Sequence, residues 1–198
     1  MLVSTFELLV KSQLPGPKQV EPPIDVPPPE VLDKLKKISR TVIQGYFLTI
    51  SNLNSFDVTI SLIFTALTPS ITIKETITLL DVTGENIQGD LSEPNLLDGK
   101  ARYTLTIKAN DTGLFILQPD FFAQPQLLND GNFEVRGYVE VFISSLSKGE
   151  QSARLLLTPE HRGTFFKNLD KEDPQLDQIV YPLPTARGGS LFQLNYSA

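Results

Sequence analysis

The sequence predicts a mainly β protein: an antiparallel β-sandwich of seven to nine strands with an N-terminal proline-rich arm and one short helix. From Thr41 onward apolar and polar residues alternate with a period of two, which is typical of half-buried strands. Turns rich in Gly, Asn, Asp and Pro separate these runs and leave no room for crossover helices. Seven of the fifteen prolines lie within the first thirty residues. We therefore expect an arm over residues 1–40 and a β-sandwich domain over residues 41–198.

The arm begins with a candidate strand, Ser4–Lys11, which is apolar on one side at Phe6, Leu8 and Val10. The proline-rich segment that follows, Leu14–Pro29, predicts a stiff spacer of the polyproline type. Such a spacer would detach the strand from the main body.

A short amphipathic helix is expected from about Pro29 to Ser39. Proline is favoured near a helix start, and early acids followed by late lysines suit the helix dipole. The apolar residues recur at helical spacing, at Val31, Leu35 and Ile38.

The clearest strand of the domain is Val58–Ala66, in which every second residue is apolar and most residues between them are Ser or Thr. Two mixed, proline-punctuated stretches, Asp81–Gly99 and Phe166–Gly189, are expected to be long loops. The same reasoning predicts further strands at Tyr46–Ile50, Ile71–Thr78, Arg102–Ala109, Leu114–Leu117, Phe133–Ile143, Ala153–Leu157 and Ser190–Tyr196.

Composition excludes several chemistries. The 198 residues include no cysteine, which rules out disulfides, thiolate metal sites and cysteine nucleophiles. The single histidine, His161, cannot build a multi-histidine metal site within one chain. A net charge of −6 opposes binding to nucleic acid or anionic lipid. Without a convincing signal peptide or an apolar run long enough to insert into a membrane, we expect a cytoplasmic protein with no cofactor and no metal.

Three segments of the chain carry a resemblance to a known group of proteins: YFLTISNLNSFDVTISLIFTAL, YTLTIKANDTGLFIL and FEVRGYVEVFISS. Their succession of turns and alternating strands resembles bacterial immunoglobulin-like β-sandwich accessory proteins of the sensory rhodopsin transducer type. The resemblance covers Val42–Phe166 and contains no catalytic or ligand signature. It implies an immunoglobulin-like fold and an interaction role, and no functional residues carry over.

The densest polar cluster is the segment 158–164, which contains Glu160, His161 and Arg162. An arginine fork and an imidazole both suit anions, so the cluster is a candidate loop for a carboxylate, phosphate or sugar. The alternative is an ordinary turn, started by Pro159, with a surface ion pair.

Two other polar segments are weaker candidates. Arg187-Gly188-Gly189-Ser190 resembles a fragment of an anion-binding loop, but it lacks the phosphate-loop spacing and is better explained as a turn before a strand. The acidic segment 170–177 could gather a calcium ion through its carboxylates, but Lys171 interrupts it and a solvated loop is the favoured interpretation. Its acids are Asp170, Glu172, Asp173 and Asp177.

Some strands carry more apolar residues than one buried face requires, and the surplus suggests an interface. The sequence contains two pairs of adjacent aromatic residues, Phe121-Phe122 and Phe165-Phe166. One buried face of a strand can take only one ring of each pair, so the other ring is available to contact a partner. The spacer could carry the first strand roughly 50 Å, so we expect it to pair with a neighbouring subunit in a homo-oligomer. The candidate interface residues are Phe6, Leu8, Val10, Leu156 and Phe166.

The poverty of catalytic side chains favours a function without catalysis. We expect a non-catalytic structural or adaptor module that acts through contacts with itself or with another protein, and not an enzyme. The alternative is a small-ligand or carbohydrate-binding β-sandwich, although the chain lacks tryptophan, the usual platform for stacking a sugar.

Overall fold

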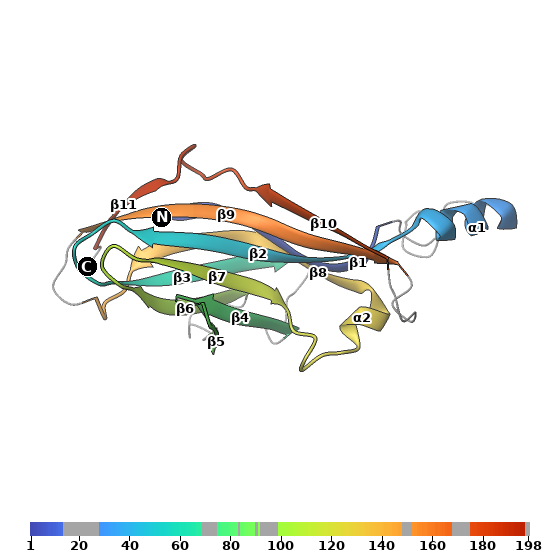
Figure 1. Ribbon diagram of the computed structural model, residues 1–198, viewed down its shortest axis with the longest axis horizontal. Coiled ribbons are helices and arrows are strands. Elements are labelled where there is room, and N and C mark those ends of the chain that lie inside the picture. Colours follow the sequence, from blue (N-terminus) through green and yellow to red (C-terminus); the bar gives the residue numbers. More distant parts are fainter. Residues whose placement is uncertain are drawn as a thin grey trace.

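The mainly β fold is confirmed. A computed structural model describes residues 1–13, 28–68, 75–82, 84–89, 91, 99–147, 152–167 and 175–196. These residues form a nearly barrel-shaped antiparallel sheet of eleven strands (Figure 1). In chain order the elements are β1 (Leu2–Ser12), α1 (Pro29–Ile38), β2 (Thr41–Asn52), β3 (Val58–Thr68), β4 (Thr76–Asp81), β5 (Asn86–Gly89), β6 (Lys100–Ile107), β7 (Thr112–Pro119), α2 (Leu127–Asp130), β8 (Asn132–Ile143), β9 (Ser152–Lys167), β10 (Gln175–Pro182) and β11 (Leu191–Asn195).

The sheet branches at β2. The main strand order is β5-β4-β7-β2-β1-β8-β3-β6, and β9 lies along β2 and carries β10 and β11. On one edge β2 pairs with β1 up to Gln44 and with β7 from Tyr46 onward. Gly45 lies at the switch, where an added Cβ would be 3.2 Å from the carbonyl oxygen of Leu117. Because glycine has no side chain, β1 and β7 can diverge from each other at this position of β2.

The core fills the space inside the curved sheet. The predicted inward face of β3 is buried throughout, from Val58 to Ala66. Rings from several strands meet there: Phe64 stacks on Phe115 at 5.4 Å between centroids and contacts Phe6 edge-on at 5.5 Å. Such pairs add about 0.5–1.5 kcal/mol beyond their buried area.

The N-terminal strand belongs to the chain's own sheet, which corrects the expectation that it stands apart and reaches a neighbour. β1 pairs with β2 on one side and with β8 on the other. Phe6, Leu8 and Val10 are 3%, 0% and 0% exposed. The alternation had indicated a buried face, but it contains no information about which strands provide the burial.

β1 and β2 therefore form a hairpin, and α1 lies in the connection between them. The Gln13 N–H donates to the Arg40 carbonyl oxygen at 2.7 Å, and the Ser12 and Ser39 hydroxyls are 3.1 Å apart, so the two ends of the loop are joined. The expected helix is confirmed as α1, which begins at Pro29 and projects away from the sheet (Figure 1). Residues 14–27, with the expected spacer, lie outside the described residues.

Several elements differ from the sequence-based expectations. Strands β5 and β10 occur in stretches that we expected to be loops, and a one-turn helix, α2, precedes β8 and ends at Gly131 with φ of 55°. The first half of the expected strand Ile71–Thr78 lies outside the described residues, and β4 begins at Thr76. The described helices include none long and apolar enough to cross a membrane.

Candidate functional site

The predicted polar cluster lies in the middle of β9 and is not a turn. Glu160, His161 and Arg162 pair with β2 and with β10. Pro159 fits the strand because its ring nitrogen faces the gap between β10 and β11, where its carbonyl oxygen accepts the Leu183 N–H at 2.8 Å. A proline whose nitrogen faces such a gap removes no ladder hydrogen bond.

Strand alternation separates the three side chains. His161 lies on the inward face and is only 5% exposed, whereas its two neighbours point outward. The Arg162 guanidinium bonds the Glu160 carboxylate at 3.1 Å and lies 4.5 Å from the centroid of the Phe47 ring. The structure therefore does not bring these residues together as an anion-binding triad.

His161 is the centre of a partly buried hydrogen-bond network. Its Nε2 accepts the backbone N–H of Glu7 at 3.0 Å, so the proton of the neutral ring is on Nδ1. Nδ1 then donates to the Tyr181 hydroxyl at 2.9 Å, and this hydroxyl donates to Gln44 Oε1 at 3.2 Å. Four strands, β1, β2, β9 and β10, are joined through one imidazole.

The network continues to the surface through Glu7. Its carboxylate accepts from the Gln44 amide at 3.2 Å and from Arg136 Nε at 2.8 Å, and the Arg136 side chain is largely exposed. The pairing of β1 with β2 ends at Leu9, so the Glu7 N–H has no partner on β2. The imidazole Nε2 of His161 accepts this hydrogen bond in place of a backbone carbonyl oxygen of β2.

Electrostatics hold the histidine neutral. Burial lowers the pKa of His161, and the Glu7 charge opposes this shift with a smaller effect. Burial also raises the pKa of the Tyr181 and Tyr46 hydroxyls. With both ring nitrogens engaged by the protein, the imidazole acts as a structural clamp.

The acidic segment 170–177 and the glycine-rich segment 187–190 are the other two sites that the sequence suggested. Asp177 lies in β10 and pairs with Arg40, and the remaining acids of the segment 170–177 lie outside the described residues. Within the described ranges no group of three or more His, Asp or Glu side chains could hold a metal ion. The segment around Gly188 is a turn with φ of 75°, and β11 follows it as expected.

The predicted interface residues are mostly internal. Phe6, Leu8, Val10 and Phe166 are buried, whereas Leu156 is 36% exposed on β9. The doubled Phe121-Phe122 divides as expected, since one ring packs against the core and the Phe122 side chain is 90% exposed.

Sequence reasoning missed the most apolar exposed strand of the described chain. On β10, Leu176 is 55% exposed, Ile179 43% and Val180 59%. The run Ile179-Val180-Tyr181, two β-branched residues and an aromatic one, was the signal that could have identified this strand.

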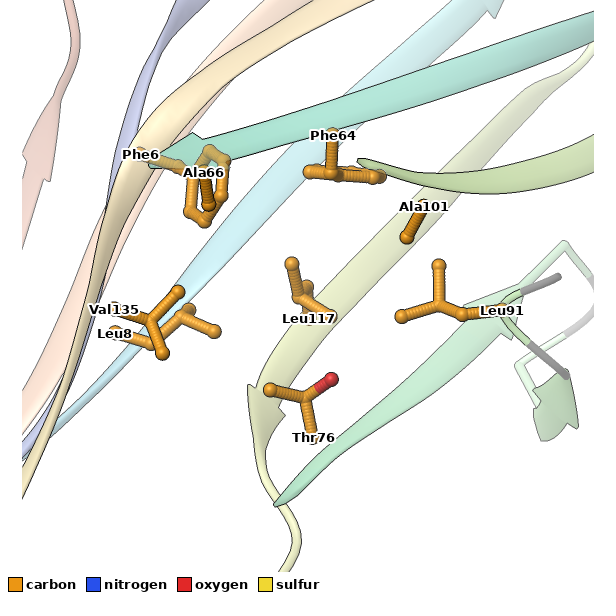
Figure 2. A pocket seen from close by; sticks show the side chains of 9 residues that line it. All are labelled: Phe6, Leu8, Phe64, Ala66, Thr76, Leu91, Ala101, Leu117 and Val135. Atoms are coloured by element: carbon orange, nitrogen blue, oxygen red, sulfur yellow. The ribbon is translucent and has the colours of Figure 1, made fainter. Parts of the chain in front are cut away.

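A small cavity lies in the described core, and its lining is apolar except for Thr76 (Figure 2). Phe6, Phe64 and Leu117 approach it from different strands. Its volume of about 10 Å³ is close to what a single water molecule occupies. This cavity is too small for an organic ligand.

A shallow depression lies on the outer face of β3, β6 and β8. Phe142 and Leu146 provide its apolar side. Its hydroxyl groups include Ser61 and Thr104, which bond each other at 3.0 Å.

Comparison of the chain with protein-family models, with curated proteins and with solved structures found no match in any of the three.

Proposed function

We propose that the protein is a non-catalytic structural or adaptor module, and that the loop carrying α1 is the element with which it contacts another protein. One observation carries the proposal: Gln13 and Arg40 are hydrogen-bonded neighbours at the end of a regular hairpin, yet residues 14–39 are inserted between them. Hairpin loops normally need two to five residues, and much longer loops within compact domains are usually functional or disordered.

The length and the apolar residues of α1 suit a helix that binds in a hydrophobic groove of a partner protein. α1 has ten residues, fewer than the roughly 12–15 at which isolated helices become stable in water, so a partner surface would stabilise it. Val31 is 41% exposed, and Leu35 is partly exposed one turn later on the same side. Apolar residues at this spacing are typical of helices that bind in hydrophobic grooves.

The polar cluster on β9 supports an interaction role because protein partners already occupy its side chains. Both ring nitrogens of His161 have protein partners, and the Arg162 guanidinium is held by Glu160 and Phe47. A catalytic site needs polar groups that converge on open space.

The immunoglobulin-like sandwich remains part of this proposal. The branch at β2 divides the sheet into one leaf of β1, β8, β3 and β6 and another of β7, β4 and β5. The contacts of the Phe115 ring with Phe64 and Tyr103, at 5.4 and 5.0 Å between centroids, join the two leaves as in a sandwich core.

The test is site-specific photo-crosslinking in cells of the source organism. A photoreactive phenylalanine at position 31 lies on the apolar side of α1, and the same residue at position 33 is the matched control because Asp33 lies about 200° around the helix. We expect one discrete adduct from position 31 only, and its loss when Leu35→Glu is added. Equal labelling from both positions, or no adduct from position 31, contradicts the proposal.

A shortened variant separates binding from folding. Replacing residues 14–39 with Asn-Gly continues the existing register from Ser12 opposite Thr41 and closes a two-residue turn between Gln13 and Arg40. We expect this chain to keep the circular dichroism spectrum of the strands and to lose the partner. Unfolding would show that the loop supports the sheet.

A further inference from the structure

The edge strand β10 presents backbone groups in an ordered way. Among the described residues its single strand neighbour is β9. The Leu183 N–H points to β9, where it bonds the Pro159 carbonyl oxygen. Since alternate residues of a strand direct both backbone groups to the same edge, residues 181, 179 and 177 also face β9. Leu176, Gln178 and Val180 therefore direct their N–H and C=O groups to the free edge.

The side chains at this edge lack the usual protection. Exposed edges normally carry charged residues, especially lysine, that oppose pairing with another chain. The β6 edge follows this rule with Lys100 and Arg102. On β10 the one charged residue, Asp177, is neutralised by Arg40, and the neighbouring Leu176 and Val180 are 55% and 59% exposed.

We propose that β10 pairs with β10 of a second copy of this chain, antiparallel, about a two-fold axis at Gln178. This register places Gln178 opposite its symmetry mate and Leu176 opposite Val180 on both sides of the axis. All three residues that direct backbone groups to the free edge then form hydrogen-bonded pairs.

The arrangement is self-complementary in side chains and in charge. The aliphatic Leu176–Val180 pairs lie on the outer face and flank an amide pair at the axis, and cross-strand pairs of this kind stabilise a sheet. Asp177 lies opposite Ile179 rather than opposite another acid. Pro182 follows the last of these pairs, where a missing N–H ends the edge without leaving a donor unpaired.

This surface is separate from the apolar side of α1, although Arg40 links the two regions. Pairing of one strand makes a small interface, so we expect a weak dimer that depends on concentration. The pairing and the proposed function therefore fail or succeed independently.

Disulfide trapping tests the register, because the chain has no cysteine of its own. In a hydrogen-bonded antiparallel pair the opposed Cα atoms are about 5.5 Å apart, which is within disulfide range. Gln178→Cys is expected to give a covalent dimer under mild oxidation. Val180→Cys is the matched control, since its symmetry mate lies about 13 Å away along the strand.

A mixture of Leu176→Cys and Val180→Cys chains is expected to give the mixed dimer. The proposal is overturned if Gln178→Cys gives no covalent dimer, or if Val180→Cys alone links as rapidly.

Sedimentation of the full chain tests the association without a crosslink. We expect the wild type to dimerise as its concentration rises toward about 1 mM, and Val180→Lys to raise the dissociation constant about tenfold or more. Leu146→Lys, at an apolar side chain that is 71% exposed on another surface, is expected to behave as the wild type. A monomeric wild type over this range, or equal effects of the two lysines, contradicts the proposal.

Discussion

Replacement of His161 by leucine tests whether the imidazole clamp holds β1 in the sheet. Leucine fills the space of the imidazole at a site that is 5% exposed, so the variant loses hydrogen bonds but creates no cavity. The Glu7 N–H would lose its acceptor, whereas the Tyr181 hydroxyl would keep Gln44. A buried donor without a partner costs about 1–3 kcal/mol, so we expect the free energy of unfolding to fall by about 2 kcal/mol at pH 8.

The loss depends on pH in a direction set by the lowered pKa of His161. The unfolded chain protonates this histidine below about pH 6.5, whereas the folded chain resists protonation until a lower pH. Because the unfolded state then binds more protons, the wild type loses stability as the pH falls from about 6.5 toward the folded pKa. The leucine variant has no such group, so the difference between the two proteins narrows at pH 5.

Urea unfolding of both proteins at pH 8 and pH 5 measures this difference directly. Tyr181→Phe is the matched control, because it removes one hydroxyl of the network and leaves the Glu7–His161 bond; we expect a loss of about 1 kcal/mol. A difference between wild type and His161→Leu below about 0.5 kcal/mol at pH 8, the range of ordinary surface substitutions, would refute the clamp. A difference as large at pH 5 as at pH 8 would refute the neutral imidazole.

Three further predictions concern the sheet. Asn52→Ala is expected to destabilise by about 3 kcal/mol or more in thermal or urea unfolding, because the buried amide donates to the carbonyl oxygens of Phe56, Ile107 and Lys108 at 2.8–3.1 Å. Gly137→Ala should cost about 3 kcal/mol, since its Cβ would lie 2.0 Å from the Thr65 carbonyl oxygen, while Gly189→Ala, with nothing within 4 Å, should stay within about 0.5 kcal/mol; equal midpoints would contradict this packing. Deletion of residues 1–12 should abolish the cooperative unfolding transition, because buried side chains such as Phe6 and Leu8 contribute about 1.5–3 kcal/mol each against a total stability of about 5–15 kcal/mol.

Alternation in the sequence predicted which side chains are buried, and it could not predict which strands lie beside one another. The inward residues of β3 and β8 are those expected, for example Ile60 and Val141. Phe6 and Leu8 were correctly assigned to one apolar side, but the strand that carries them was placed on a neighbouring subunit. The hydrogen bond between Gln13 and Arg40, which makes β1 and β2 a hairpin, joins residues separated by the whole proline-rich segment.

The segment 158–164 was expected to be a loop or turn because Pro159 and Gly163 are typical of turns, whereas it is part of strand β9. In the structure Pro159 lies in a strand, opposite a gap that depends on where β10 ends and β11 begins. The partner of His161 is the backbone of Glu7, which leaves no trace in side-chain chemistry. Strand β10 was missed because its residues are exposed on both faces, so burial imposes no alternation on them.

The central claim is that β1 is an internal strand of the chain's own sheet and that α1 therefore lies in the connection of the β1–β2 hairpin. Hydrogen exchange of the full chain tests it most directly, because amides of internal strands open only with global unfolding. We expect the backbone N–H groups of residues 6–10 to exchange as slowly as those of β3 and β8, including the Glu7 N–H that bonds His161. Exchange of these amides at the rate of an unstructured peptide, with β3 and β8 still protected, would contradict it.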